Sequence, residues 1–174
     1  AMEKACKNNE TTMAAILGLD DTFVNSVCEN IPNVVPANYN CPGQIVISGS
    51  KSSIDKACES IKEIGGKTIV LPVGGAFHSS YMESAKKELE DAIKSLKFNK
   101  PDKPIYQNFD ANPYIDIEKI KKNLINQLTS PVLWKQTINK LIADNYKSFI
   151  ECGPGRVLQG LVKKINRDMD VSSI

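Results

Sequence analysis

The segment Asn38-Tyr39-Asn40-Cys41-Pro42-Gly43-Gln44-Ile45-Val46-Ile47-Ser48 decides how the first half of the chain folds. Two strand-like runs, Val34 to Asn40 and Gln44 to Ser48, are separated by the sequence Asn-Cys-Pro-Gly, which is a turn signal. The segment therefore predicts a β-hairpin.

The segments on either side of the hairpin each predict a helix and a strand. Upstream, Thr12 to Leu19 is a short apolar run, and Asp20 and Asp21 are suitable N-caps for a helix that Pro32 ends. The apolar residues of that helix recur at helical spacing, at Phe23, Val27, Cys28 and Ile31. Downstream, a second helix ends at Gly65-Gly66, and one apolar face is made by Ile54, Ala57, Cys58, Ile61 and Ile64.

With a further strand expected from Lys67 to Val73, the element order becomes β-α-β-β-α-β. This is the order of the split βαβ, or ferredoxin-like, arrangement. We therefore expect residues 12–79 to form a ferredoxin-like small subdomain within an α/β protein.

Residues 80–174 are expected to be mainly helical. A long amphipathic helix runs from Met82 to Leu96, and further helices are expected over residues 117–128, 132–142 and 157–165. Two short strands are expected over residues 105–109 and 148–152. Helices that cover a parallel sheet need more strands than these two to bury them. The region is therefore interpreted as a fragment of a larger α/β subdomain.

The composition excludes several classes of protein. The 174 residues carry 22 Lys+Arg and 20 Asp+Glu, a net charge of +2 that is too balanced for a surface that binds nucleic acid. No apolar run approaches the roughly 20 residues of a membrane span. The five cysteines are odd in number and include no C-x-x-C pair, which argues against a disulfide framework and against a zinc site. We expect a cytoplasmic protein without a metal or a cofactor.

His78 is the only histidine, and it lies among glycines and serines between an apolar strand and a helix. Loops that follow strands are where α/β proteins place reactive groups, so His78 is the main candidate for chemistry. The alternative is a structural role, which is common for a lone histidine.

Other polar residues have both a functional and an ordinary interpretation. The amides of Asn38, Asn40 and Gln44 can hydrogen-bond a polar ligand or simply serve the turn. Gln127, at the end of a helix, is expected to be a surface residue. The run Glu151–Gly155 precedes a helix N-terminus, where it can bind an anion or form a tight turn.

Five segments gain meaning when they are considered together. They occur in a fixed order and at a spacing that resembles malonyl-CoA:acyl carrier protein transacylase of bacterial fatty acid synthesis. The resemblance covers residues 3–165, but only the C-terminal part of that family. The segments are TMAAILGL (12–19), NYNCPGQIVISG (38–49), LPVGGAFHS (71–79), QL with PVxW (127–134) and ECGPGxVL (151–158).

The resemblance implies a ping-pong mechanism in which a serine of a G-H-S-x-G elbow takes malonyl from coenzyme A. The phosphopantetheine thiol of acyl carrier protein then removes the malonyl group. By resemblance, His78 is the general base, and the main-chain carbonyl of Gln127 orients its imidazole. Because alanine also has that carbonyl, Gln127→Ala is expected to cost far less than His78→Ala.

The resemblance also implies which residues line the substrate cleft. Asn38, Asn40 and Gln44 match cleft positions of the family. Phe77 matches the position at which related domains with Ala-Phe-His prefer malonyl over bulkier α-branched units, because a large ring leaves no room for an α-methyl group. By this resemblance, residues 80–174 are the C-terminal portion of the large, α/β-hydrolase-like acyltransferase subdomain.

Three family features have no counterpart in this sequence: the G-x-S-x-G nucleophile elbow, the N-terminal G-Q-G segment and the arginine that binds the malonyl carboxylate. We therefore expect the chain alone to be inactive and to self-associate through apolar faces left by the missing portion.

Two alternatives remain. One is a catalytically silent module that binds the carrier protein or acts as a scaffold. The other is a small enzyme that uses Cys152 or Ser79 as its own nucleophile with His78.

Overall fold

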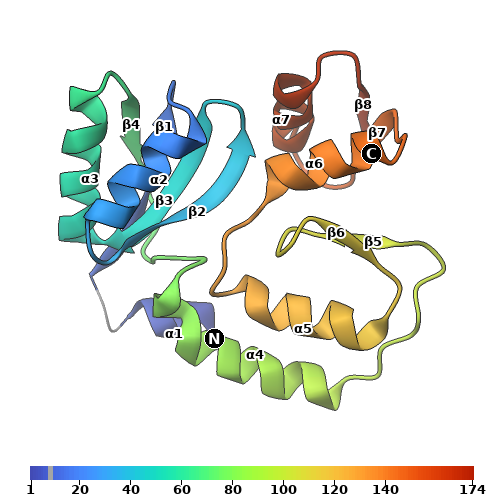
Figure 1. Cartoon of the computed structure of the whole chain (residues 1–174). Coiled ribbons are helices and arrows are strands. Elements are labelled where there is room, and N and C mark those ends of the chain that lie inside the picture. Colours follow the sequence, from blue (N-terminus) through green and yellow to red (C-terminus); the bar gives the residue numbers. More distant parts are fainter. Residues whose placement is uncertain (8–9) are drawn as a thin grey trace.

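The computed structural model describes residues 1–7 and 10–174. Its first half contains a four-stranded antiparallel sheet in the order β2-β3-β1-β4, formed by β1 (Thr11–Leu17), β2 (Val34–Cys41), β3 (Gln44–Ser50) and β4 (Lys67–Val70). Helix α2 (Asp21–Asn30) connects β1 to β2, and α3 (Lys51–Glu63) connects β3 to β4 (Figure 1). The predicted β-α-β-β-α-β order is therefore confirmed.

The predicted hairpin is also confirmed, with a turn of only two residues. Cys41 pairs with Gln44, so the turn consists of Pro42 and Gly43. The proline ring restricts φ to about −65°, and Gly43 adopts a φ of +70°, which a residue with a side chain rarely does. This combination is typical of a type II turn.

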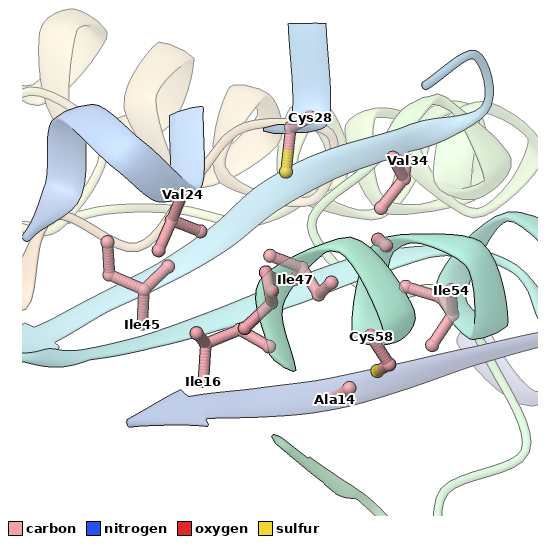
Figure 2. Close-up of a cluster of buried hydrophobic side chains, with 11 residues drawn as sticks. Ala14, Ile16, Val24, Cys28, Val34, Ile45, Ile47, Ile54 and Cys58 are labelled. Atoms are coloured by element: carbon pink, nitrogen blue, oxygen red, sulfur yellow. The ribbon is translucent and has the colours of Figure 1, made fainter. Parts of the chain in front are cut away.

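Both faces of the central strands β1 and β3 are covered. On one face, β-branched side chains of the strands pack under α2 and α3, as Figure 2 shows for Ile16, Ile45 and Ile47. On the other face, Met13 and Val46 form a second cluster, against which the half-buried Phe77 packs. Because successive side chains of a strand alternate between faces, two covered faces explain why β1 and β3 are almost continuously apolar.

The rest of the chain contains helices and two small sheets (Figure 1). Strands β5 (Ile105–Gln107) and β6 (Asn112–Tyr114) pair antiparallel, whereas β7 (Ser148–Glu151) and β8 (Asp170–Ser173) pair parallel. The helical elements are α1 (Met2–Cys6), the 3-10 turn η1 (Ser80–Met82), α4 (Glu83–Ser95), α5 (Ile117–Gln127), α6 (Trp134–Ala143) and α7 (Val157–Ile165). Ala5 of α1 packs against Met82 and Ala85.

Several predicted boundaries were wrong. Strand β4 ends at Val70 rather than Val73, although Leu71 still donates a backbone hydrogen bond to Met13 O at 2.9 Å. Helix α6 begins at Trp134 rather than Val132, because Val132 pairs with β2 instead. Helix α1 and strands β6 and β8 were not predicted.

Several apolar side chains of the predicted helices are exposed rather than buried. Ile64, Leu96 and Val157 lie at or just beyond a helix end, where the chain does not face the packed side; Val157 is 71% exposed. Phe23, at 56% exposed, lies within α2, whose buried face is formed by Val24 and Cys28.

Candidate active site

The loop that carries His78 joins β4 to η1 and is held by side-chain hydrogen bonds. The backbone N–H of Ala76 donates to Thr11 Oγ1 at 3.1 Å, which ties the loop to the start of β1. The buried Ser79 hydroxyl donates to Ala76 O at 2.6 Å and accepts from Tyr81 N at 3.3 Å. The residues on both sides of His78 are therefore fixed in position.

His78 is half-buried, and its backbone lies in the left-handed region with a φ of 57°. Non-glycine residues adopt this conformation at an energetic cost, which the surrounding hydrogen bonds must offset. The conformation is an observed feature of the one residue that sequence reasoning selected for acid-base chemistry.

The imidazole of His78 contacts the main chain of a helix 49 residues later. Nδ1 lies 3.0 Å from the carbonyl oxygen of Gln127. A carbonyl oxygen can only accept a hydrogen bond, so Nδ1 must carry the proton in this contact. In the neutral ring, Nε2 then keeps a free lone pair and can take a proton from another group.

Gln127 is the last residue of α5, and its side chain holds the turn that follows. Its amide nitrogen donates to Ser130 O at 2.9 Å and to Pro131 O at 3.0 Å. The sequence predicted a surface residue, but Gln127 is half-buried. Its carbonyl accepts from His78, and its side-chain amide donates to the following turn.

The turn after Gln127 leads directly to the four-stranded sheet. Val132 N donates to Ala37 O at 2.8 Å, and Tyr39 N donates to Val132 O at 2.9 Å. Asn38 lies between these two hydrogen bonds, in a parallel bridge with Val132. Asn38 and Gln127 are thus linked through one short stretch of backbone.

Two side-chain contacts connect the four-stranded sheet and its helix α2 to the C-terminal helices α6 and α7. Lys135 of α6 forms an ion pair with Asp21 of α2. Lys164 of α7 donates to the side-chain oxygen of Gln44 at 3.2 Å, and the thiol of Cys41 also faces that oxygen. Gln44 therefore lies against α7, and Asn40 is half-buried in β2.

Phe77 lies beside a cavity of about 470 Å³ that is also lined by Met2, Cys6 and Gly74. A side chain at Gly75 would overlap Cys6 Sγ, so the glycine lets this loop lie close against α1 with the Cys6 side chain in its present position. Burial, and to a lesser extent Glu3, raises the pKa of the Cys6 thiol above its usual value.

The Glu151–Gly155 run is not an open anion site. The carboxylate of Glu151 accepts from Leu158 N and from Gln159 N, both at 3.1 Å. These are the free backbone N–H groups at the start of α7, so the protein's own carboxylate occupies the position that an anion would take. Of the two interpretations of this run, the structure favours the tight turn.

The alternative nucleophiles are poorly suited to work with His78. Ser79 is buried, and its hydroxyl proton is already donated to Ala76 O. Cys152 is exposed and follows β7 in the C-terminal region.

Two further results concern the described residues, 1–7 and 10–174. No group of three or more His, Cys, Asp or Glu side chains in these ranges is placed to hold a metal ion. None of the helices there has the length and apolar character needed to cross a membrane.

Sequence reasoning missed the contributions of Thr11 and Val132. Thr11 has no local signal, because it acts on a loop 65 residues away. Val132 lies in the Pro131-Val132-x-Trp134 motif but was assigned to a helix. Its pairing with β2, through hydrogen bonds to Ala37 and Tyr39, has no local signal in the sequence.

The fold and the His78 loop define an acyl transferase: residues 3–174 match the family described as "Acyl transferase domain", and the chain belongs to this family. Within this family, the chain belongs to the malonyl CoA-acyl carrier protein transacylases, of which it matches only a part.

The transacylase of Staphylococcus aureus (strain MRSA252) is 41% identical over 99% of this chain and 58% of its own length. The crystal structure of the enzyme from Clostridium perfringens has a TM-score of 0.95 at 38% identity, over 99% of this chain and 56% of that one. A chain also matches from the structure of a type II PKS acyl-carrier protein in complex with its malonyl-transacylase. Its TM-score is 0.94 at 30% identity, and the match covers 99% of this chain and 57% of that one. The chain thus spans little more than half the length of these relatives.

Proposed function

We propose that this chain provides the base and part of the substrate cleft of a malonyl transfer site. The observation that supports this most directly is the 3.0 Å contact between His78 Nδ1 and Gln127 O. It leaves Nε2 free to accept a proton, which is what a general base requires. A main-chain carbonyl here performs the orienting task that a carboxylate performs in other triads.

The proposed reaction has two balanced halves. In the first, a serine hydroxyl supplied by the rest of a complete transacylase attacks the thioester carbonyl of malonyl-CoA and gives its proton to His78 Nε2. The C–S bond breaks, and the leaving coenzyme A thiolate takes that proton. In the second half, the phosphopantetheine thiol of acyl carrier protein gives its proton to Nε2 and attacks the acyl-serine. The serine oxygen leaves and regains the proton.

The proposed substrates and partner follow from the family. Asn38, Asn40 and Gln44 are proposed to line the cleft, and Phe77 to restrict the α-carbon of the acyl group. The neighbour solved as a complex with its acyl-carrier protein supports a carrier protein as partner. The proposed location is the cytoplasm, and the proposed reaction uses no cofactor.

We also propose a division of the chain. Residues 12–79 are assigned to a ferredoxin-like small subdomain, and residues 80–174 to the C-terminal portion of the large acyltransferase subdomain. The four-stranded sheet with its own core supports the first assignment. The parallel pair β7–β8 supports the second, because parallel strands are nearly always part of a larger, covered sheet.

An acylation assay tests the proposed function. The chain alone, incubated with malonyl-CoA, is expected to show no malonyl adduct by intact mass measurement, because a base without a serine cannot form the acyl-enzyme. A chimera that adds the N-terminal portion of the Staphylococcus aureus relative is expected to form the adduct. A stoichiometric adduct on the chain alone would contradict the proposal.

The role of His78 is tested in that chimera. His78→Ala is expected to lower the rate about 10²- to 10⁴-fold or more, the usual cost of losing a positioned base. Asn33→Ala is the matched control, because Asn33 is exposed and shares the positive φ, at 62°. A His78→Ala chimera that kept more than about a tenth of the parent rate would refute the assignment.

A further inference from the structure

The side chain of Gln127, and not only its carbonyl, is built into the support of His78. Its amide nitrogen is shared between Ser130 O and Pro131 O, at 2.9 and 3.0 Å. Both carbonyls belong to the turn that follows α5, so these contacts help to define how the chain leaves the helix. Because one side chain bonds two successive carbonyls, it restricts the backbone conformation of the turn.

The Gln127 carbonyl itself is only weakly held by the helix end. Its nearest backbone donor is Ser130 N, at 3.4 Å, which is long for a hydrogen bond. The carbonyl therefore depends on the shape of the turn for its direction toward His78. That shape is set at one end by the Gln127 amide and at the other by the pairing of Val132 with β2.

We propose that Gln127 is a positioning residue whose side-chain amide, by bonding Ser130 O and Pro131 O, aims its own carbonyl at His78 and so selects the Nδ1–H tautomer. This rests on the proposed function, in which Nε2 acts as the base. It adds a measurable cost to the expectation that Gln127→Ala is far milder than His78→Ala. Alanine keeps the carbonyl, but it removes the two bonds that direct it.

The tautomer can be measured directly, because His78 is the only imidazole in the chain. Long-range ¹H–¹⁵N NMR spectra of the 174-residue chain, recorded with the imidazole neutral, distinguish a protonated Nδ1 from a protonated Nε2. The parent is expected to show mainly Nδ1–H. In Gln127→Ala and in the length-matched Gln127→Met, the Nδ1–H form is expected to fall below half of the neutral population.

Thr129→Ala is the control, because Thr129 lies in the same turn and its hydroxyl contacts Asn126 O at 3.4 Å rather than the Ser130–Pro131 carbonyls. It is expected to leave the tautomer unchanged. In the active chimera, Gln127→Met is expected to lower the acylation rate about tenfold or more, with the main loss in kcat.

The outcomes separate this proposal from the proposed function. An Nε2–H parent would refute the contact on which both rest. An Nδ1–H parent with unchanged Gln127 variants would overturn only the positioning role, as would an equal effect of Thr129→Ala. If neither Gln127 variant folded, the side chain would be a general stability residue, which also overturns the proposal.

Discussion

The four-stranded sheet and the C-terminal strand pairs bury their apolar side chains to very different degrees. Ile16, Ile47 and Ile54 of the first region are at most 1% exposed, whereas Ile150 of β7 is 60% exposed and Ile174 84%. The first region has helices on one face of its sheet and a loop on the other, and both faces of its central strands are covered. The second has pairs of short strands, which are rarely stable alone. The two regions therefore differ in how far the side chains of their strands are covered.

Hydrogen exchange should show the largest difference between the two regions. The amides of β1 and β3 lie in the buried sheet and are expected to exchange only through global unfolding. The amides of β7 and β8 are expected to exchange at least about 100-fold faster, because their opening exposes little additional apolar surface. Equal protection in both regions of a strict monomer would contradict the comparison.

Matched isoleucine truncations should give the next largest effect. Ile47→Ala is expected to lower the free energy of unfolding by about 2–5 kcal/mol, since it leaves a cavity in a closed core. Ile150→Ala removes the same atoms from an exposed position and is expected to change it by less than about 0.5 kcal/mol. Urea denaturation measures both, and similar losses would show that Ile150 is buried in solution, for example by self-association.

The pH dependence of the free energy of unfolding should report whether the Cys28 thiol is buried in the core under α2. Burial, and secondarily the charge of Glu29, raises the pKa of the Cys28 thiol to about 12. An unfolded thiol titrates near 8.5, so the contribution of Cys28 is complete below that pH and is lost as the pH rises toward 12.

Above about pH 9, the free energy of unfolding of the parent should therefore fall more steeply with pH than that of Cys28→Val. The difference between the two slopes is at most about 1.4 kcal/mol per pH unit. Cys152→Val, at an exposed cysteine, should retain the parent slope. A parent slope that matched Cys28→Val would mean that the thiol is solvated.

The smallest predicted effect concerns the start of α7. Glu151→Ala removes the acceptor of two backbone N–H groups and is expected to cost about 0.3–1 kcal/mol, the usual value for an anionic group at an exposed helix N-terminus. Glu59→Ala, on the exposed surface of α3, should be nearly neutral. Thermal unfolding of both variants measures the difference, and an equal change would show that Glu151 does not act as a cap.

The sequence was most informative where local signals and final contacts agree. Pro42-Gly43 specifies the hairpin turn by backbone preference alone, and the apolar spacing of residues 54–61 specifies the buried face of α3. Strands β6 and β8 have no such signal, because three or four residues are too few to show an alternating pattern, and β8 also pairs with a strand about 20 residues earlier. Phe23 shows the same limit within a helix, since spacing identifies an apolar stripe but not which edge of it is covered.

The site could be predicted only in part. The position of His78 between a strand and a helix marked it as a candidate from the residues themselves. Its pairing with Gln127 followed from the family resemblance, because no periodicity relates residues 49 positions apart. The bonds made by Thr11 and Val132 are set by how distant segments meet, whereas those of the Gln127 side chain lie within one turn whose shape no sequence pattern indicated.

The bridge at Val132 also affects which edge of the four-stranded sheet is open to pairing with another molecule. The sheet has two outer strands, β2 and β4, and an uncovered outer strand is a template for adding another chain. Val132 occupies β2 between Ala37 and Tyr39, and Pro36 lacks an N–H to offer. Strand β4 has no such cover among the described contacts, and its Ile69 and Val70 are about half exposed. Aggregation through this sheet should therefore grow from the β4 side.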